Sequence, residues 1–415
     1  MNVLELSEQE IVRRQSLQEL RNMGIDPYPA AEFPTNAVSE DIKNEFKEEE
    51  EKREVVIAGR MMSRRVMGKA SFVELQDSKG RIQVYITRDD ICPGEDKALY
   101  NTVFKRLLDI GDFIGIKGFV FRTQTGEISV HAQSLTLLSK SLKPLPIVKY
   151  KDGVAYDKFD DPELRFRQRY VDLIVNDGVK DTFLKRATVV RTLRSVLDEA
   201  GYTEVETPTL QSIAGGASAR PFITHFNALN IDMYMRIATE LYLKRLIVGG
   251  FEGVYEIGKN FRNEGMDRNH NPEFTCMELY VQYKDYNWMM AFTEQLLEKI
   301  CIAVNGSAES KVGDNVISFK APFRRLPILD AIKEKTGYDC NGKSEDEIRA
   351  FCLEKGMEVD ETMGKGKLID ELFGEFCEGT FIQPTFITDY PVEMSPLTKM
   401  HRSKPGLTER FELMV

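Results

Sequence analysis

The sequence is short of the residues that build zinc sites, disulfide frameworks and membrane spans. Its six cysteines form no Cys-x-x-Cys pair, and only four histidines accompany them. This pattern argues against a structural zinc ion and a disulfide framework, and it favours a reducing cytoplasm. No apolar run approaches the ~20 residues that span a membrane, and the N-terminus lacks the basic start and apolar core of a signal peptide. We expect a cytoplasmic protein with no membrane segment.

The composition is typical of globular domains, with 42% hydrophobic and 29% charged residues. A chain of 415 residues is too long for one ordinary core, so two or three domains are expected. The net charge of −10 argues mildly against nucleic-acid binding. Acids collect in the first fifty residues, however, and Lys and Arg are frequent from 52 to 81. A local basic patch is compatible with the acidic total, because net charge does not describe patches.

The first part of the chain has a helical pattern followed by strand patterns. Residues 5–23 have helical periodicity, and residues 55–138 contain short β-like segments separated by turn signals. Five strands in about 85 residues predict a small barrel, with the OB-fold as the natural candidate. We therefore expect an N-terminal helical extension at 1–50 and an OB-fold domain at 51–142.

Residues 143–415 are expected to form a second, mixed domain. A helix is predicted from Asp181 to Ala200, ended by Gly201, and residues 251–283 have the pattern of a long β-hairpin. Charged helical segments at about 325–380 predict a helical insertion. The expected fold class is α+β, with a barrel followed by an antiparallel-sheet domain.

The hairpin pattern places polar residues on one face. In the second segment Glu278 and Tyr280 alternate with apolar residues, and in the first Arg262 and Glu264 share a face. If the segments pair, these four side chains form one polar surface. On the pattern alone, a solvated sheet face of matched charges is the ordinary interpretation, and a binding face is the alternative.

The string FRNEGMDRNHNPEF resembles motif 2 of the class II aminoacyl-tRNA synthetases. In that family the carboxylate of an amino acid attacks the α-phosphate of ATP, and a fixed guanidinium stabilises the charge that develops. The resemblance implies that Arg262 is the catalytic residue, that Phe274 stacks on adenine and that Glu264 holds the adenine amino group. The implied ATP-binding residues are Arg262, Glu264, Arg268, His270, Asn271 and Phe274.

The strings GGASARPF and RIATELYLKRL, with MELY, resemble the lysyl-tRNA synthetases, and the bacterial forms above others. The resemblance runs from about residue 10 to the last residue and implies an L-lysine site made by Gly216, Glu240, Glu278 and Tyr280. Two acids suit a cationic substrate, because a buried ammonium needs a carboxylate partner. An aspartyl or asparaginyl enzyme is the competing interpretation, but the same acids would repel an acidic side chain.

Two further features of the sequence concern tRNA binding and dimerisation. An outward Phe72 beside Gln83, near Arg64, is able to stack on and hydrogen-bond a splayed-out base, although an aromatic residue covering a barrel face explains it as well. The resemblance implies that the barrel reads the U-rich anticodon of tRNA(Lys) through Arg64, Phe72, Gln83 and Glu127. The 181–208 segment resembles motif 1, the homodimer interface of the family, but an ordinary amphipathic helix fits the pattern equally.

The last residues carry one further site. Glu412, in Phe-Glu-Leu, matches an acid that binds Mg²⁺ in the family. We find no motif 3 after motif 2, so a C-terminal fragment that is inactive alone is expected. The leading function is the ATP-dependent ligation of lysine to tRNA(Lys), and the alternative is a non-catalytic tRNA-binding paralogue.

Overall fold

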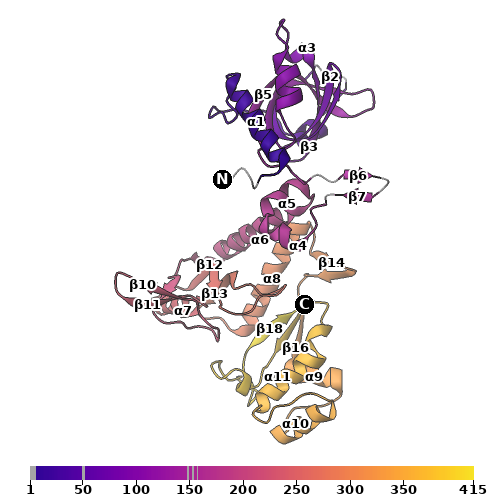
Figure 1. The fold of residues 1–415 in the computed structure, drawn as a ribbon. Helices are drawn as coiled ribbons and strands as arrows, with labels where there is room; N and C mark the ends of the chain where they lie inside the picture. Colours follow the sequence, from indigo (N-terminus) through magenta and orange to yellow (C-terminus); the bar gives the residue numbers. More distant parts are fainter. Residues whose placement is uncertain (1–5, 49–51, 147–148, 152–153, 157) are drawn as a thin grey trace. The chain divides into compact units, whose positions relative to one another are not determined.

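The computed structural model describes the chain except residues 1–5, 49–51, 147–148, 152–153 and 157 (Figure 1). It divides into two compact units, residues 1–179 and 180–415, which are treated separately below. The expected boundary between residues 50 and 51 lies outside the described residues, and the three-part division into domains stays a prediction. Within the described ranges, no helix is both long and apolar enough to cross a bilayer.

The first unit is built on a closed five-stranded barrel, which agrees with the expected small barrel. The strands pair in the order β1-β2-β3-β5-β4 around the barrel. Their bounds are β1 (Glu54–Met67), β2 (Ala70–Gln76), β3 (Arg81–Thr87), β4 (Phe113–Arg122) and β5 (Ile128–Ser139). Buried and half-buried residues alternate strictly along β2 and β3. The predicted inward and outward faces are therefore present in these two strands.

Helices close the barrel from outside the strands. Leu20 of α1 (Glu8–Asn22) and Ile42 of α2 (Ser39–Asn44) are fully buried in the barrel core. Two helices between β3 and β4 are not among the predicted elements: α3 (Arg88–Ile91) and the π-helix η2 (Leu99–Leu107). The buried residues of η2 have the sequence spacing of one helical face, and this spacing was the signal that could have predicted the helix. These residues are Tyr100, Val103, Phe104 and Leu107.

The first unit continues beyond the barrel with a hairpin and two short helices. Asp161 caps the first of these helices, because its side chain accepts a hydrogen bond of 2.8 Å from the Leu164 N–H. The elements are β6 (Lys149–Lys151), β7 (Val154–Tyr156), α4 (Pro162–Arg167) and α5 (Arg169–Val175).

The second unit contains the predicted hairpin. Helix α6 (Val179–Glu199) ends before Gly201, whose φ of +82° matches the expected left-handed terminus. The hairpin consists of β12 (Gly253–Phe261) and β13 (Glu273–Val281), and β8 (Thr203–Glu204) pairs in parallel with β12. The neighbouring elements are β9 (Leu210–Gln211), β10 (Ile223–Phe226), β11 (Ile231–Met235), α7 (Glu240–Val248) and α8 (Tyr286–Asn305).

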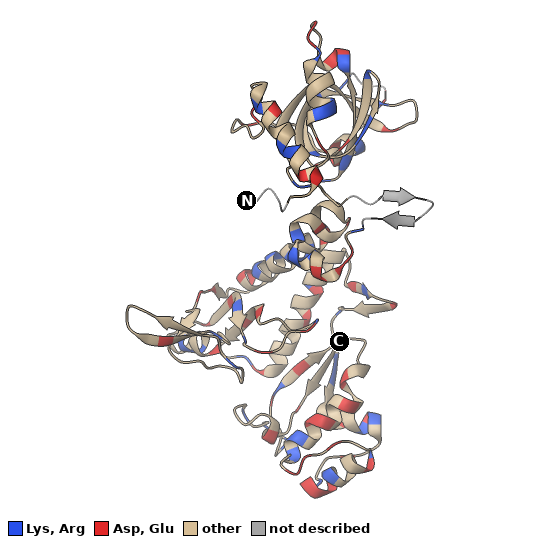
Figure 2. Ribbon diagram, in the orientation of Figure 1, with Lys and Arg blue, Asp and Glu red and all other residues tan. Residues whose placement is uncertain are grey.

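The rest of the second unit is a small sheet covered by helices. Its strands pair in the order β16-β17-β18. The predicted helical stretch is present as three helices, and they carry both signs of charge on their surface (Figure 2). The elements are β14 (Glu309–Val312), β15 (Asn315–Ser318), β16 (Arg324–Pro327), α9 (Ile328–Thr336), α10 (Glu345–Glu354), α11 (Lys365–Phe376), η3 (Glu378–Thr380), β17 (Thr385–Thr388), η4 (Val392–Met394) and β18 (Phe411–Met414).

Candidate active site and nucleic-acid interface

The hairpin β12–β13 puts a row of functional side chains on one face. Glu256 lies opposite Glu278, and Val254 lies opposite Tyr280. Directly paired residues of antiparallel strands point to the same side of the sheet. Phe274, Glu278 and Tyr280 therefore share a face, as the alternation of the sequence predicted.

A buried ion pair lies against this face of the hairpin. Arg236 and Glu256 form it, with side chains only 4% and 5% exposed. The Arg236 guanidinium also donates to the Lys259 carbonyl oxygen at 2.8 Å. A Cβ on Gly258 would lie 2.2 Å from the Arg236 Nη2 atom, so only a glycine leaves room for the guanidinium. Arg236, for which the sequence predicts no role, follows β11 and attaches that segment to the face of the hairpin that carries Glu278.

The four residues expected to bind lysine lie together. The Glu278 carboxylate accepts hydrogen bonds from the Thr239 N–H at 3.4 Å and from the Tyr280 hydroxyl at 3.1 Å. Burial raises the pKa of Tyr280 above its usual value, and the charges of Glu278 and Glu240 raise it further. Both acids therefore act on the same phenol. At Gly216, where φ is +89°, a Cβ would lie 3.3 Å from the Glu240 Cβ, so this backbone passes directly over the start of α7.

Arg262 lies just beyond the end of β12, on the same surface. Its N–H donates to the Pro272 carbonyl oxygen at 2.8 Å, and its Cζ atom lies 5.2 Å from the centre of the Phe274 ring. Burial raises the pKa of the Cys276 thiol, Glu278 raises it further and Arg262 lowers it. Cys276 thus lies within electrostatic reach of both groups. Together with Tyr280, which feels Glu278 and Glu240, it connects Arg262 to the acids along one continuous face.

The Arg262 side chain has an unsatisfied donor. Its Nε atom is buried and has no hydrogen-bond partner within the described part of the chain. Such a group costs about 1–3 kcal/mol when it is left without a partner. An anionic ligand that accepts from this atom would recover that cost.

Glu264 belongs to a neighbouring hollow that joins two of the sequence motifs. Its carboxylate accepts from the Arg220 N–H at 3.3 Å, and the Asn263 N–H donates to the Arg220 carbonyl oxygen at 2.7 Å. The hollow measures about 500 Å³ and includes Ser218 and Gly265 in its lining. Arg220, which the sequence analysis did not single out, therefore links the GGASARPF string to the motif 2 loop.

Three of the expected ATP-binding residues lie apart from Arg262, at the exposed tip of the loop. The His270 ring pairs with Asp267 at 2.8 Å, and the Asn271 amide donates to the Glu273 carbonyl oxygen at 2.6 Å. Arg268 is exposed between them. No contact found among the described residues joins this tip to the Arg262 guanidinium.

Glu412 lies on β18 and pairs with Arg410. It lines a hollow of about 460 Å³ together with Asp370, Glu378 and Glu393. Carboxylate oxygens are the donors that Mg²⁺ prefers, so the chemistry of these residues fits the ion. Over the ranges that the structure describes, no three His, Cys, Asp or Glu side chains are arranged to hold a metal. Glu412 as a metal ligand stays a prediction.

A hollow of about 710 Å³ on the barrel brings together three of the four residues expected to meet the anticodon. The Gln83 amide oxygen accepts from the Ser129 hydroxyl at 2.9 Å, which leaves its NH₂ group to donate to a ligand. The Phe72 ring lies 5.0 Å from that of Tyr85. The residues of the hollow that matter below are Lys43, Arg65, Phe72, Arg81, Gln83 and Glu127.

Arg64 is not brought to this hollow. Its guanidinium turns toward η2 and donates to the carbonyl oxygens of Phe104 and Leu108, and burial lowers its pKa. The reason is a register shift in β1 between Met61 and Ser63, which exchanges the inward and outward faces beyond it. Arg65, opposite Phe72, lines the hollow instead.

Known proteins match both the region of the candidate active site and the barrel. Residues 161–415 match the family described as tRNA synthetases class II (D, K and N), and residues 55–138 match the OB-fold nucleic acid binding domain. A lysine–tRNA ligase of Porphyromonas gingivalis is 68% identical over 417 residues, which cover 100% of this chain and 72% of that protein. The chain belongs to the lysine–tRNA ligase family.

Other members of the lysine–tRNA ligase family match over almost the whole chain. The protein of Azobacteroides pseudotrichonymphae genomovar. CFP2 is 64% identical over 99% of this chain and 82% of its own length. That of Christiangramia forsetii is 63% identical over 99% and 72%. The expected α+β class, with an OB-fold before a class II synthetase domain, is confirmed, and the non-catalytic paralogue is not favoured.

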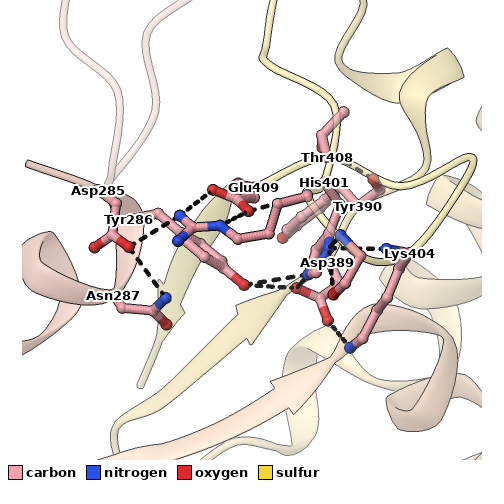
Figure 3. Close-up of polar contacts among 11 residues, drawn as sticks. Asp285, Tyr286, Asn287, Asp389, Tyr390, His401, Lys404, Thr408 and Glu409 are labelled. Carbon is pink, nitrogen blue, oxygen red and sulfur yellow. Dashed lines mark hydrogen bonds and ion pairs between the residues drawn. The ribbon is translucent and has the colours of Figure 1, made fainter.

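This member of the lysine–tRNA ligase family also has a polar network that anchors the β17–β18 connection to the start of α8 (Figure 3). Asp389, with φ +58°, accepts from the Tyr286 hydroxyl at 3.3 Å and pairs with Lys404. The His401 Nδ1 atom accepts from the Ser403 and Lys404 N–H groups at 3.0 and 3.1 Å. A neutral His401 ring therefore carries its proton on Nε2, toward Asp389 and Tyr286. Because α8 follows β13, the network ties the strand of Glu412 to the hairpin.

Proposed function

We propose that this chain activates L-lysine with ATP to form lysyl-adenylate and transfers the lysyl group to tRNA(Lys). The observation that carries the proposal is the shared face of Arg262, Glu278 and Glu240. The Arg262 guanidinium lies within electrostatic reach of the Cys276 thiol, which also feels Glu278, and Glu278 acts together with Glu240 on the Tyr280 phenol. A cationic amino acid held by the acids would thus present its carboxylate beside a group that binds phosphate.

The two acids are assigned to the two amino groups of lysine, and the Glu240 carboxylate pairs with Lys244 in the structure. Glu278 is fixed by two donors, the Thr239 N–H and the Tyr280 hydroxyl, and it keeps lone pairs for an ammonium. Because the pKa of Tyr280 is raised, the phenol stays protonated and remains a donor. Glu240, beside the Gly216 backbone, is assigned the α-amino group, and Glu278 the side-chain ammonium. An aspartate side chain would meet like charge at the same place.

Arg262 supplies the positive charge at the reacting phosphate. Its buried Nε–H is a donor that a phosphate or carboxylate oxygen would satisfy, and Phe274 offers a ring beside it for the adenine. No covalent intermediate with the enzyme is needed, because the amino-acid carboxylate is itself the nucleophile. Its attack on the α-phosphate forms a carboxyl–phosphate bond and releases pyrophosphate.

ATP and Mg²⁺ enter the proposal as substrate and metal ion. Glu412 is the residue assigned to Mg²⁺, and Asp370, Glu378 and Glu393 place further carboxylate oxygens in the same hollow. When bound, the ion would neutralise phosphate charge. Glu264, Arg268, His270 and Asn271 are assigned to the remainder of ATP, with Arg268, His270 and Asn271 on a loop whose tip is exposed.

Three further proposals each rest on a single observation: tRNA(Lys) as a partner, a homodimer and a cytoplasmic location. The barrel hollow is assigned to the anticodon of tRNA(Lys), and a homodimer is assigned to α6, where Phe183 and Leu184 are 46% and 55% exposed. Each of the six cysteines is a free thiol, which suits a reducing cytoplasm.

Pyrophosphate exchange into ATP tests the activity directly. In the full-length protein we expect exchange that depends on lysine and does not respond to aspartate. Glu278→Gln should raise the lysine concentration that gives half-maximal exchange by about tenfold or more, since a charge-assisted hydrogen bond contributes about 1.5–3 kcal/mol. Glu273→Gln, which changes an exposed acid of the same strand, is the matched control. Exchange that is equal with lysine and aspartate would reject the proposal.

A further inference from the structure

One lining residue of the barrel hollow comes from outside the barrel strands and their turns. Lys43 belongs to α2, in the segment before the barrel, yet it lines the same hollow as Phe72, Gln83 and Glu127. The sequence predicts a helical extension for this segment and no role for Lys43. The position of Lys43 therefore needs an explanation of its own.

The position of α2 is fixed by buried contacts. Ile42, the neighbour of Lys43, is fully buried in the barrel core. At the other end of the helix, the Ser39 N–H and hydroxyl donate to the Asp77 carboxylate at 2.6 and 2.8 Å, and Ser39 is 1% exposed. These contacts hold Lys43 at the edge of the hollow, as a part of the folded unit.

Lys43 pairs there with Glu127. The Lys43 Nζ atom lies 3.6 Å from the Glu127 Oε1 atom, with side chains 41% and 49% exposed. The Glu127 backbone is itself held, because its N–H donates to the Thr123 hydroxyl at 3.0 Å. An exposed pair of this kind contributes only about 0–1 kcal/mol to stability. Both partners are therefore open to exchange for a ligand at little cost.

Arg81, another cation of the hollow, is neutralised differently. Arg81 pairs with Glu74 at 3.3 Å and also with Asp177 at 3.7 Å, so two acids already face it. Lys43 faces Glu127 alone among the ion pairs of the described residues. The Lys43 ammonium is therefore held by one exposed carboxylate, which a phosphate of an incoming strand is able to replace.

We propose that Lys43 is a phosphate contact for the RNA strand that enters the barrel hollow, and that a phosphate of the strand replaces the exposed Glu127 carboxylate as its partner. The inference rests on the proposed function, in which this hollow receives the anticodon. Lys43 would supply affinity and register without reading a base, whereas Glu127 would discriminate among bases. At N3, uracil carries an N–H that a carboxylate accepts, whereas cytosine carries an unprotonated nitrogen there and donates only from its neighbouring N4 amino group.

RNA binding by variants of the chain tests this division of roles. The probes are two labelled RNA hairpins with loops of equal length, one with uridines and one with cytidines at the three central positions. Fluorescence anisotropy is measured between about 50 and 300 mM salt, because each phosphate contact on a single strand contributes about 0.7 to the slope of log affinity against log salt. Lys117→Ala is the matched control, since Lys117 is an exposed lysine on β4 of the same barrel.

We expect Lys43→Ala to weaken binding of both hairpins equally, by about fivefold at low salt, and to reduce the slope by about 0.7. Lys43→Arg should preserve both values, and Glu127→Gln should mainly reduce the preference for uridine. An unchanged slope in Lys43→Ala, a change no larger than that of Lys117→Ala, or a loss confined to one hairpin would overturn the inference. If the unmodified chain does not prefer the uridine loop, the anticodon assignment of the hollow fails with it. If the unmodified chain prefers the uridine loop but the Lys43 variants do not behave as expected, the proposed function stands without the Lys43 contact.

Discussion

The hairpin of the candidate active site and the first strand of the barrel obey the same alternation rule with different outcomes. β12 and β13 pair over nine residues without a register shift, from Gly253 opposite Val281 to Phe261 opposite Glu273. β1 shifts its register against β2 between Met61 and Ser63. One extra residue exchanges every side chain beyond it between the two faces of a strand. A functional face read from alternation is therefore dependable only as far as the register continues.

The largest effect on stability should come from the buried ion pair of Arg236 and Glu256 at the hairpin. Glu256→Gln removes the buried partner of Arg236, and an uncompensated buried charge destabilises a protein by about 3–5 kcal/mol. Urea unfolding of the second unit, followed by Trp288 fluorescence, measures the change. Glu273→Gln breaks an exposed pair with Lys259 on the same hairpin and should change stability by less than about 1 kcal/mol. Equal losses in the two variants would show that burial does not distinguish these pairs.

The next largest effect concerns catalysis by Arg262, which lies just beyond the end of β12, where β12 and β13 pair without a register shift. Arg262→Ala should lower the rate of adenylate formation by about 10²–10³-fold, the usual result of removing one fixed donor to a developing charge. Affinity for an anticodon hairpin should be unchanged, because the barrel carries that contact. Arg268→Ala, at the exposed tip of the loop, is the control and should cost less. If the two substitutions reduce the exchange rate equally, Arg262 has no special place.

The smallest effect separates the two arginines at the register shift. Arg65→Ala should weaken binding of a uridine-loop hairpin by about tenfold, as expected for a lost charge-assisted hydrogen bond. Arg64→Ala should leave that affinity within about twofold once the variant is folded, because it mainly removes bonds to the Phe104 and Leu108 carbonyl oxygens. Arg64→Ala should instead lower the melting temperature of the first unit. The reverse pattern of affinities would mean that the alternation of β1 continues through Met62.

These cases show what the sequence could predict and why the rest escaped. Alternation and turn signals were enough for the barrel strands and for the face with Glu278 and Tyr280, because both depend on local periodicity. The partner of Arg236 was not predictable, since Glu256 is 20 residues away and the pair forms only after the strands and α7 have packed. The motif resemblance named Glu264 and Phe274, but it gave no sign that Arg220 holds the Glu264 carboxylate.

The lysine site and the phosphate site are proposed to share one surface. The reactivity of the Cys276 thiol tests this directly. This thiol lies within electrostatic reach of both Glu278 and Arg262, and it is half-buried while the other five cysteines are buried. Alkylation of Cys276 by iodoacetamide, followed by mass spectrometry, should be slowed by L-lysine alone and by Mg²⁺–ATP alone. Protection by neither ligand, or by only one of them, would contradict a shared surface.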